Sequence, residues 1–175
     1  MERIMVALDG SDHSDKALDL ASDIAAKSGA ELVLLHVISD KPLSDAERHM
    51  AEVEFPDEIV ASLDATGIDA GGDPQTRAQR MLQRYADVAR GFREAMGQRL
   101  ISRSRTRARD RGVRSVQTVL EDGDPASTII RLAKGLHVDM LFLGSRGLGG
   151  AKSLLMGSVS HKVAHLAECT CVSVK

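Results

Sequence analysis

The sequence of 175 residues predicts a doubly wound α/β domain, in which helices cover both faces of a mainly parallel, five-stranded sheet. Short, continuously apolar runs recur along the chain, as they do in strands that are buried on both faces. Segments whose apolar residues recur at helical spacing separate these runs. Residues 4–38 already contain a strand, a helix and a second strand, which make one βαβ unit.

The N-terminal βαβ unit has clear boundaries. Residues 4–8 (IMVAL) predict the first strand, and the second covers residues 32–38 (LVLLHVI). Between them, Ser11, Asp12 and Ser14 offer capping oxygens for the N-terminus of a helix. Gly29 is expected to end that helix, at a position where a left-handed residue is favoured.

The regular alternation stops after the second strand. Residues 40–75 form an acidic excursion without a strong helical or strand period, and glycines and a proline punctuate its end. A lid over a ligand, a partner surface and a tolerated insertion all stay open for it. A long helical pattern follows over residues 76–111. We expect residues 1–175 to form a single domain that includes the excursion.

The C-terminal part of the chain returns to alternation. We predict strands over residues 116–120, 140–143 and 171–174, and a helix over residues 159–166. Asp124 followed by Pro125 is typical of another helix N-terminus, and Gly135 is expected to stop that helix. The predicted strand order is 3-2-1-4-5, which places the reversal of the sheet between strands one and four.

Composition argues against several classes of protein. The net charge of −2 gives no field that favours nucleic acid, and 2% aromatic residues offer few platforms for base stacking. The apolar run at residues 4–8 is too short for a signal-peptide core or a membrane span. Two cysteines exclude a disulfide scaffold and favour a reducing compartment. We therefore expect a cytoplasmic protein that binds neither nucleic acid nor membranes.

A glycine-rich loop follows the fourth predicted strand. Residues 144–150 read GSRGLGG, and residues 157–160 read GSVS at the start of a helix. Glycines let phosphate oxygens approach the backbone, and free N–H groups at a helix start attract anions. A mobile surface loop with an ordinary serine N-cap is the alternative. The stretch is not a Walker A loop, because Arg146 and Ala151 occupy positions that require glycine.

Asp9 and Gly144 follow strands one and four, so both should lie at the reversal point of the sheet, where open α/β sheets bind ligands. The Asp9 carboxylate could accept hydrogen bonds from ribose hydroxyls or hold a metal ion that bridges phosphates. A carboxylate that caps the first helix is the alternative, and the two roles are compatible.

The spacing Gly144-x2-Gly147-x9-Gly157-Ser158 resembles the nucleotide-binding signature of the universal stress protein family. Residues 6–11 (VALDGS) and 123–125 (GDP) extend the resemblance over most of the chain outside the excursion. It implies that ATP binds, together with Mg²⁺ or Mn²⁺. The nucleoside would lie beside Asp9 and the phosphates at the start of the last helix. The implied contacts are Ala7, Leu8, Asp9, Ser11, Val37, Ile38, Leu143, Gly144, Arg146, Gly147, Gly157, Ser158, Val159 and Ser160, with Asp9 also as the metal residue.

The resemblance further implies a homodimer, in which the last strand, from Cys171 to Val174, pairs antiparallel with its copy. Ser173 makes this strand less apolar than the family pattern, and a strand that ends its own sheet is the alternative. The family's role implies a nucleotide-responsive regulator of the stress response with an unknown protein partner, and not an enzyme. A nucleotide-independent dimeric interaction protein of the same fold and a slow ATPase are the alternatives.

Two other clusters are weaker candidates. His161 and His165 are four residues apart and could share a metal ion, but ordinary surface histidines are favoured. Seven arginines lie between residues 99 and 114, and their spacing of about two residues winds around a helix and favours a solvated or acid-paired face. We hypothesise that the acidic excursion folds against these arginines.

Overall fold

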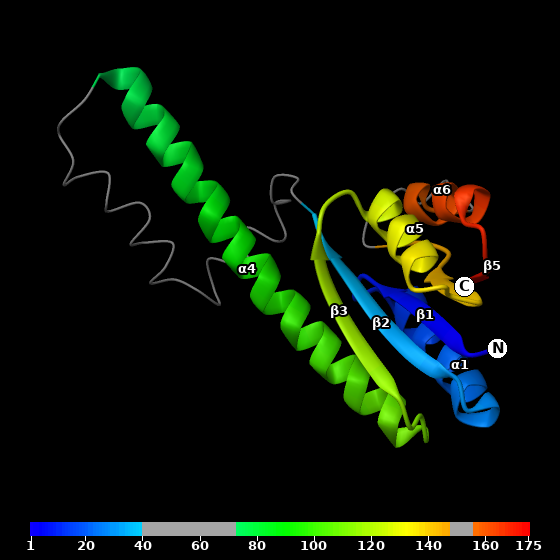
Figure 1. The fold of residues 1–175 in the computed structure, drawn as a ribbon. Coiled ribbons are helices and arrows are strands. Elements are labelled where there is room, and N and C mark those ends of the chain that lie inside the picture. Colours follow the sequence, from blue (N-terminus) through cyan, green and yellow to red (C-terminus); the bar gives the residue numbers. More distant parts are fainter. Residues whose placement is uncertain (40–72, 148–155) are drawn as a thin grey trace. The chain divides into compact units, whose positions relative to one another are not determined.

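The computed structural model describes residues 1–39, 73–147 and 156–175 (Figure 1). The chain divides into two compact units, of which one comprises residues 1–39 with 97–175 and the other residues 40–96. The first unit contains the whole sheet. Up to residue 72, the predicted acidic excursion lies outside the described residues.

The sheet has five strands, all parallel, in the order β3-β2-β1-β4-β5, which confirms the predicted order. The strands are β1 (Arg3–Leu8), β2 (Glu31–Ile38), β3 (Val116–Asp122), β4 (Met140–Gly144) and β5 (Thr170–Val174). The helices described are α1 (Asp12–Ser28), α4 (Pro74–Asp110), α5 (Pro125–Gly135) and α6 (Ser158–Leu166). Their bounds lie close to the predicted ones, so the hydrophobic pattern located each of these elements.

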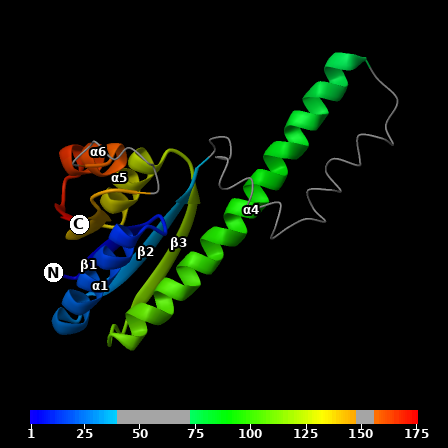
Figure 2. The same ribbon diagram turned by 180° about the vertical axis from the view of Figure 1, so that it is seen from behind.

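Helices cover both faces of the sheet (Figures 1 and 2). On one face, α1 and residues 97–110 of α4 pack against strand residues such as Ile4 and Val6. On the other, α5 and α6 pack against residues such as Met5 and Val33. Because successive residues of a strand point to opposite faces, a central strand covered on both sides must be apolar throughout. This is why β1 and β2 read as unbroken apolar runs.

The helix ends show which local signals were correct. Of the three candidate capping residues, Ser11 caps α1, and Gly29 ends the helix with a positive φ of 73°, as predicted. Asp124 caps α5, with Pro125 as its first residue. Gly135, the expected stop of α5, is instead its last helical residue.

The left-handed position after α5 belongs to His137, whose φ is 52°. The N–H groups of His137 and Val138 donate to the carbonyls of Lys134 and Ala133, at 3.1 Å and 2.9 Å. This is the hydrogen-bond pattern of a Schellman C-cap. Histidine is among the residues that enter the left-handed region more often than most, so the helix can include Gly135, the glycine that was expected to stop it.

Gly97 of α4 lies against the sheet at a point without room for a side chain. A Cβ atom there would be 2.8 Å from His36 Cδ2 in β2 and 2.9 Å from Leu120 Cδ1 in β3. Gly97 therefore allows α4 to approach these two strands closely. His36 itself is anchored by a hydrogen bond of 2.7 Å between its Nδ1 and the carbonyl oxygen of Leu8.

The arginines of α4 form a ladder with aspartates of α1. Arg107 holds both carboxylate oxygens of Asp19, at 2.6 Å and 2.7 Å. The ladder, as we call it below, consists of Arg103, Arg107 and Arg111 of α4 and Asp15, Asp19 and Asp23 of α1. These arginines are four residues apart and so share one face of the helix. The interpretation that the basic run lines no single face was wrong for this subset.

The ladder also bears on the hypothesis about the excursion. Three of the arginines that were expected to hold it are paired with α1. Residues 40–72 of the excursion lie outside the described residues.

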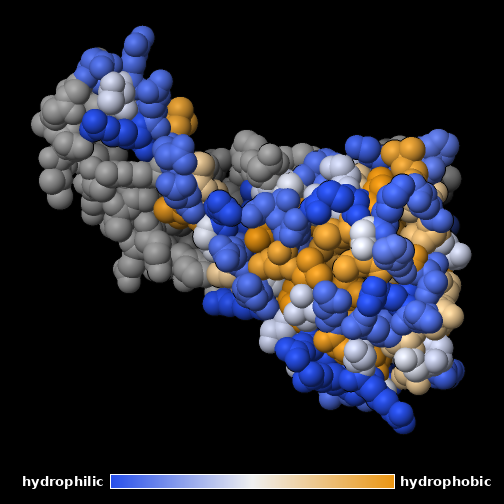
Figure 3. Space-filling model, in the orientation of Figure 1, coloured by the Kyte–Doolittle hydropathy of each residue, from blue (hydrophilic) through white to orange (hydrophobic). Residues whose placement is uncertain are grey.

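In the view of Figure 3, hydrophilic side chains cover most of the described part of α4, and apolar side chains gather over the sheet. In the part of the chain that the structure describes, no helix is long and apolar enough to cross a membrane.

The ladder predicts a change of stability with pH. The hydrogen bond from Arg107 holds the pKa of Asp19 below its ordinary value of 3.8. The stabilisation from this pair is therefore complete above that value and decreases as the pH falls through the lowered pKa. We expect Asp19→Asn to lower the free energy of unfolding by about 0.5–1 kcal/mol at pH 7. The loss should shrink below roughly pH 4, because the unfolded parent chain then takes up a proton at Asp19 that the folded state, with its lowered pKa, does not.

Urea denaturation at pH 7 and pH 3 measures this effect. Glu168→Gln is a matched control, because Glu168 pairs with Lys134 at 2.6 Å while both side chains are 68% exposed. An exposed pair of this kind contributes little, so the control should unfold like the parent protein at both pH values. Equal losses for Asp19→Asn at pH 7 and pH 3 would show that the Asp19 charge does not cause the effect.

Candidate functional site

The candidate site lies at the carboxyl edge of the sheet, where β1 and β4 end side by side. Ala7 of β1 is paired with Leu143 of β4, so the segments that follow them, Asp9 and Gly144–Gly147, start at the same edge. β1 also pairs with β2, and the chain order reverses between β1 and β4. The structure thus places the predicted site at the reversal point of the sheet.

Asp9 lies against the glycine-rich loop. Its Oδ1 accepts hydrogen bonds from the N–H group and the hydroxyl of Ser11, at 3.0 Å and 2.6 Å. Its Oδ2 faces Gly147 so closely that a Cβ atom on Gly147 would overlap it. The backbone of Gly147 therefore approaches the carboxylate so closely that any other residue would force the Asp9 side chain to shift.

Ser11, and not Asp9, caps α1. The Ser11 hydroxyl accepts a hydrogen bond of 3.2 Å from the N–H of Ser14. The same hydroxyl lies 3.3 Å from the carbonyl oxygen of Arg146. Asp9 holds Ser11 in place, so the alternative that Asp9 serves as the helix cap is wrong. Asp9, Ser11, Arg146 and Gly147 are brought together, as the predicted site requires.

Gly144 has a packing role that sequence reasoning did not foresee. A Cβ atom on Gly144 would lie 2.8 Å from Ser14 N and 2.9 Å from the carbonyl carbon of His13. The first turn of α1 therefore rests directly on the end of β4. The Gly144 carbonyl oxygen accepts a hydrogen bond of 2.7 Å from the buried hydroxyl of Ser160. Ser160, expected at the phosphates, thus also joins α6 to β4.

The N-terminus of α6 is open at Gly157. This residue is the N-cap, with no side chain to cap the helix, and its own N–H donates to the carbonyl oxygen of Ser145 at 2.7 Å. A Cβ atom on Gly157 would meet nothing closer than 3.6 Å among the described residues. Ser158 and Val159 begin the helix here. The first N–H groups of a helix have no partner within it and carry its positive dipole end.

The remaining predicted residues lie at the same edge of the sheet. Val37 and Ile38 end β2, directly after His36, which is paired with Leu8 of β1. Ile38 is buried, and its carbonyl oxygen accepts the N–H of Gly123 at 3.0 Å. Val37 and Ile38 share this edge with the end of β1 because parallel strands end together.

Two residues of the site were missed by sequence reasoning. His13 Nδ1 lies 3.0 Å from the hydroxyl of Ser145, whose side chain is buried. His13 also lines a hollow of about 340 Å³. The hollow is bounded by Gly10, Ser11, Asp12, His13, Arg146 and Gly147. No spacing in the sequence indicated this contact, because His13 belongs to the first turn of α1 and Ser145 to the segment after β4.

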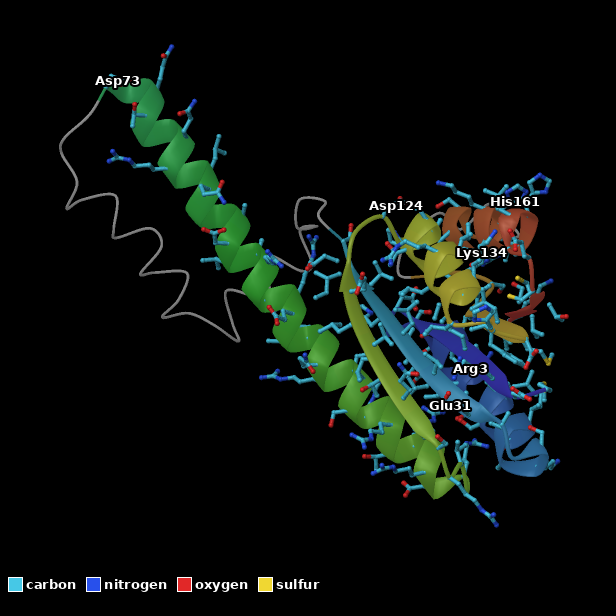
Figure 4. All side chains as sticks on the ribbon, in the orientation of Figure 1. Arg3, Glu31, Asp73, Asp124, Lys134 and His161 are labelled. Atoms are coloured by element: carbon cyan, nitrogen blue, oxygen red, sulfur yellow. The ribbon has the colours of Figure 1, made fainter. Side chains whose placement is uncertain are left out.

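A metal ion at this edge of the sheet would need oxygen atoms from a bound phosphate group, because the protein itself offers few ligand atoms there. Among the described residues, no group of three or more His, Cys, Asp or Glu side chains could hold a metal ion. Asp9 offers one carboxylate, and Mg²⁺ in nucleotide sites commonly uses one or two carboxylates with phosphate oxygens and water. His161 points outward from α6 (Figure 4), as expected of a surface histidine.

The two cysteines do not offer an alternative site. Both are free and both lie against the core beneath α5 and α6. Burial raises the pKa of the Cys169 thiol, and that of Cys171 to about 11. A thiol must lose its proton to bind a soft metal, so this environment disfavours that role and fits strand packing.

The comparison with protein families decides the relationship. The model of the universal stress protein family matches residues 1–175. The chain belongs to the universal stress protein family. Universal stress protein YxiE of Bacillus subtilis is 31% identical to it over 173 residues, which cover 99% of this chain and 98% of the relative.

Solved structures of universal stress proteins share the fold. UspA from Lactobacillus plantarum superposes with a TM-score of 0.62 at 22% identity, covering 99% of this chain and 97% of that one. A universal stress protein in complex with cAMP gives a TM-score of 0.60 at 21% identity, covering 99% and 98%. At these identities the likeness establishes the fold of this universal stress protein. Its ligand has to be argued from its own residues.

Proposed function

We propose that this universal stress protein binds ATP, together with Mg²⁺ or Mn²⁺, and acts as a nucleotide-responsive regulator without being an enzyme. The observation that carries the proposal is the arrangement around Asp9. Its carboxylate touches Gly147, and Gly157 opens the N-terminus of α6 at the same edge of the sheet. A carboxylate for a ribose or a metal ion and a helix start for phosphates are thus both present.

The start of α6 is suited to the phosphates. Gly157 leaves the backbone accessible, and the N–H groups of Ser158, Val159 and Ser160 belong to the first turn of the helix. Such N–H groups bind phosphate oxygens, and the helix dipole adds to the attraction. The Ser158 side chain is exposed and can donate a further hydrogen bond.

The end of β1 is suited to the nucleoside. Asp9 Oδ1 is occupied by Ser11, whereas no hydrogen bond to Oδ2 comes from the described residues. The half-buried side chains of Ala7 and Val37 supply apolar surface at the same edge. Solved universal stress proteins of this fold hold AMP, dAMP or cAMP. Those complexes support an adenine nucleotide as the class of ligand.

The site is poorly equipped for catalysis. A hydrolase needs a general base that is free to activate water. The Asp9 carboxylate lies against Gly147, and Ser11 already occupies one of its oxygens. We therefore propose regulation by bound nucleotide, with hydrolysis at most slow.

We also propose that the protein is a cytoplasmic homodimer paired through β5. This strand is hydrogen-bonded to β4 on one side and is the last strand in the order of the sheet. Its side chains Val172 and Val174 are only half-buried in this chain. A second copy would pair the open edge and cover this apolar surface. Sedimentation velocity that finds only monomers at micromolar concentration would contradict the dimer.

Calorimetric titration with ATP tests the proposed function. The protein is first stripped of co-purified nucleotide and then titrated with and without Mg²⁺. Binding in the micromolar range or tighter, strengthened by Mg²⁺, is expected. Folded, nucleotide-free protein that takes up no ATP would favour the second candidate, a nucleotide-independent dimeric interaction protein of the same fold.

Removal of the Asp9 carboxylate should weaken the complex without abolishing it. We expect Asp9→Ala to lose about 1–3 kcal/mol of binding free energy, because one charge-assisted hydrogen bond to the ligand disappears. Asp110→Ala removes the same charge at the end of α4 and should bind ATP as the parent does. If both variants bind ATP equally well, the role of Asp9 is limited to holding Ser11.

A further inference from the structure

Ser145 connects three elements around the glycine-rich loop. Its N–H donates to the carbonyl oxygen of Val174 in β5 at 2.6 Å, and its own carbonyl accepts the N–H of Gly157 at 2.7 Å. Its hydroxyl is hydrogen-bonded to Nδ1 of His13 in α1 at 3.0 Å. The residue is only 2% exposed. All of its polar groups are thus used inside the protein.

The position of Ser145 affects both halves of the proposed nucleotide site. On one side, Ser145 leads directly into Arg146 and Gly147, which lie against Ser11 and Asp9. On the other side, its carbonyl oxygen fixes Gly157, the N-cap of α6. A displacement of Ser145 would therefore move Gly147 and Gly157 together.

His13 provides the side-chain bond that holds Ser145 in this position. The backbone of His13 has no freedom of its own, because Gly144 packs against it too closely to accept even a Cβ atom. The imidazole is therefore presented from a fixed turn of α1. A buried hydroxyl that lost this partner would be unsatisfied and would tend to reorient.

We propose that His13 is a positioning residue of the nucleotide site, acting through Ser145 on Gly147 and Gly157. The inference rests on the proposed function, because it assigns His13 a part in holding ATP. His13 need not touch the nucleotide. It keeps Gly147 and Gly157 at the separation that the ligand requires. The free-energy cost of ordering the loop when ATP binds is therefore smaller.

Calorimetric titration of ATP with Mg²⁺ into the parent and five variants tests this role. His13→Ala and Ser145→Ala each remove one partner of the bond, and a double variant removes both. His13→Asn and His13→Gln form a matched pair. The amide of asparagine can place a polar atom where Nδ1 lies, whereas that of glutamine lies one carbon further out.

We expect His13→Ala to bind ATP about fivefold more weakly, as the loss of one ordinary hydrogen bond predicts. His13→Asn should recover most of the parent affinity, whereas His13→Gln should resemble the alanine variant. The double variant should bind no more weakly than either single variant, since both remove the same interaction. A merely structural role would lower the melting temperature without this pattern of affinities.

His13→Ala that binds ATP as tightly as the parent would overturn the inference, whatever its melting temperature. Equal affinities for His13→Asn and His13→Gln below that of the parent would overturn it as well. Both results leave the proposed function intact, because the parent protein still binds ATP. A parent protein that binds no ATP would overturn the proposed function and this inference together.

Discussion

Replacement of Gly157 by valine is expected to abolish ATP binding while the protein stays folded. The backbone of Gly157 is extended, with φ −69° and ψ 154°, which β-branched residues adopt readily. A Cβ atom there would lie 3.6 Å from Arg146 Cα and Ser145 O, which is an ordinary contact. The added side chain would nevertheless cover the start of α6, where the phosphates are proposed to bind. Two charge-assisted hydrogen bonds lost to phosphate correspond to about 100-fold or more in affinity.

Calorimetry with ATP and circular dichroism measure the two parts of this prediction. Gly135→Val is the matched control, because Gly135 has no atom within 4 Å of its Cβ position and belongs to α5. That variant should bind ATP like the parent. If Gly157→Val were folded and bound ATP with unchanged affinity, the start of α6 would not be the phosphate site.

Replacement of Gly144 by alanine is expected to destabilise the protein. Its Cβ atom would meet the backbone of His13 and Ser14 at 2.8–2.9 Å, and backbone cannot yield as a flexible side chain does. Either α1 or the end of β4 has to move, and overpacking of this kind costs about 1–3 kcal/mol. Urea denaturation should show a lower midpoint with an unchanged m-value.

Gly135→Ala provides the comparison for stability. The same added methyl group meets open space at the end of α5, and alanine favours a helix, so this variant should be up to about 1 kcal/mol more stable than the parent. Gly144 is also expected among the nucleotide contacts, and the two roles are separable. Parent-like stability combined with lost ATP affinity in Gly144→Ala would assign this glycine to the ligand and not to packing.

The fold could be predicted from the sequence because its signals are local. Unbroken apolar runs located β1 and β2, and Ser11 and Asp124 located the starts of α1 and α5. The order of the strands followed once the sheet was taken as doubly wound. His137 shows the limit of local signals, since a non-glycine residue took the left-handed position after α5.

The candidate site was predicted in part. Its location followed from the two strands whose carboxyl ends carry Asp9 and Gly144. The contacts that shape it did not, because they join segments far apart in the chain. Ser145 is hydrogen-bonded to His13, and Gly144 packs against the backbone of α1. No spacing in the sequence indicates either contact. The glycine pattern alone could not show that Gly144 is needed for packing. Nor could it show that a Cβ atom at Gly157 would meet only ordinary contacts.

The ladder between α1 and α4 has a geometrical ambiguity, because its rungs repeat every four residues. Arg99 continues the same spacing as Arg103, so a slip of α4 by one helical turn would find new partners for most of the α1 aspartates. Charge alone cannot choose between these two positions of α4. Gly97 favours the observed one, because a Cβ atom at this point would lie 2.8–2.9 Å from side-chain atoms of His36 and Leu120, which would have to shift. The absence of a side chain at Gly97 therefore helps to determine which arginines of α4 lie opposite which aspartates of α1.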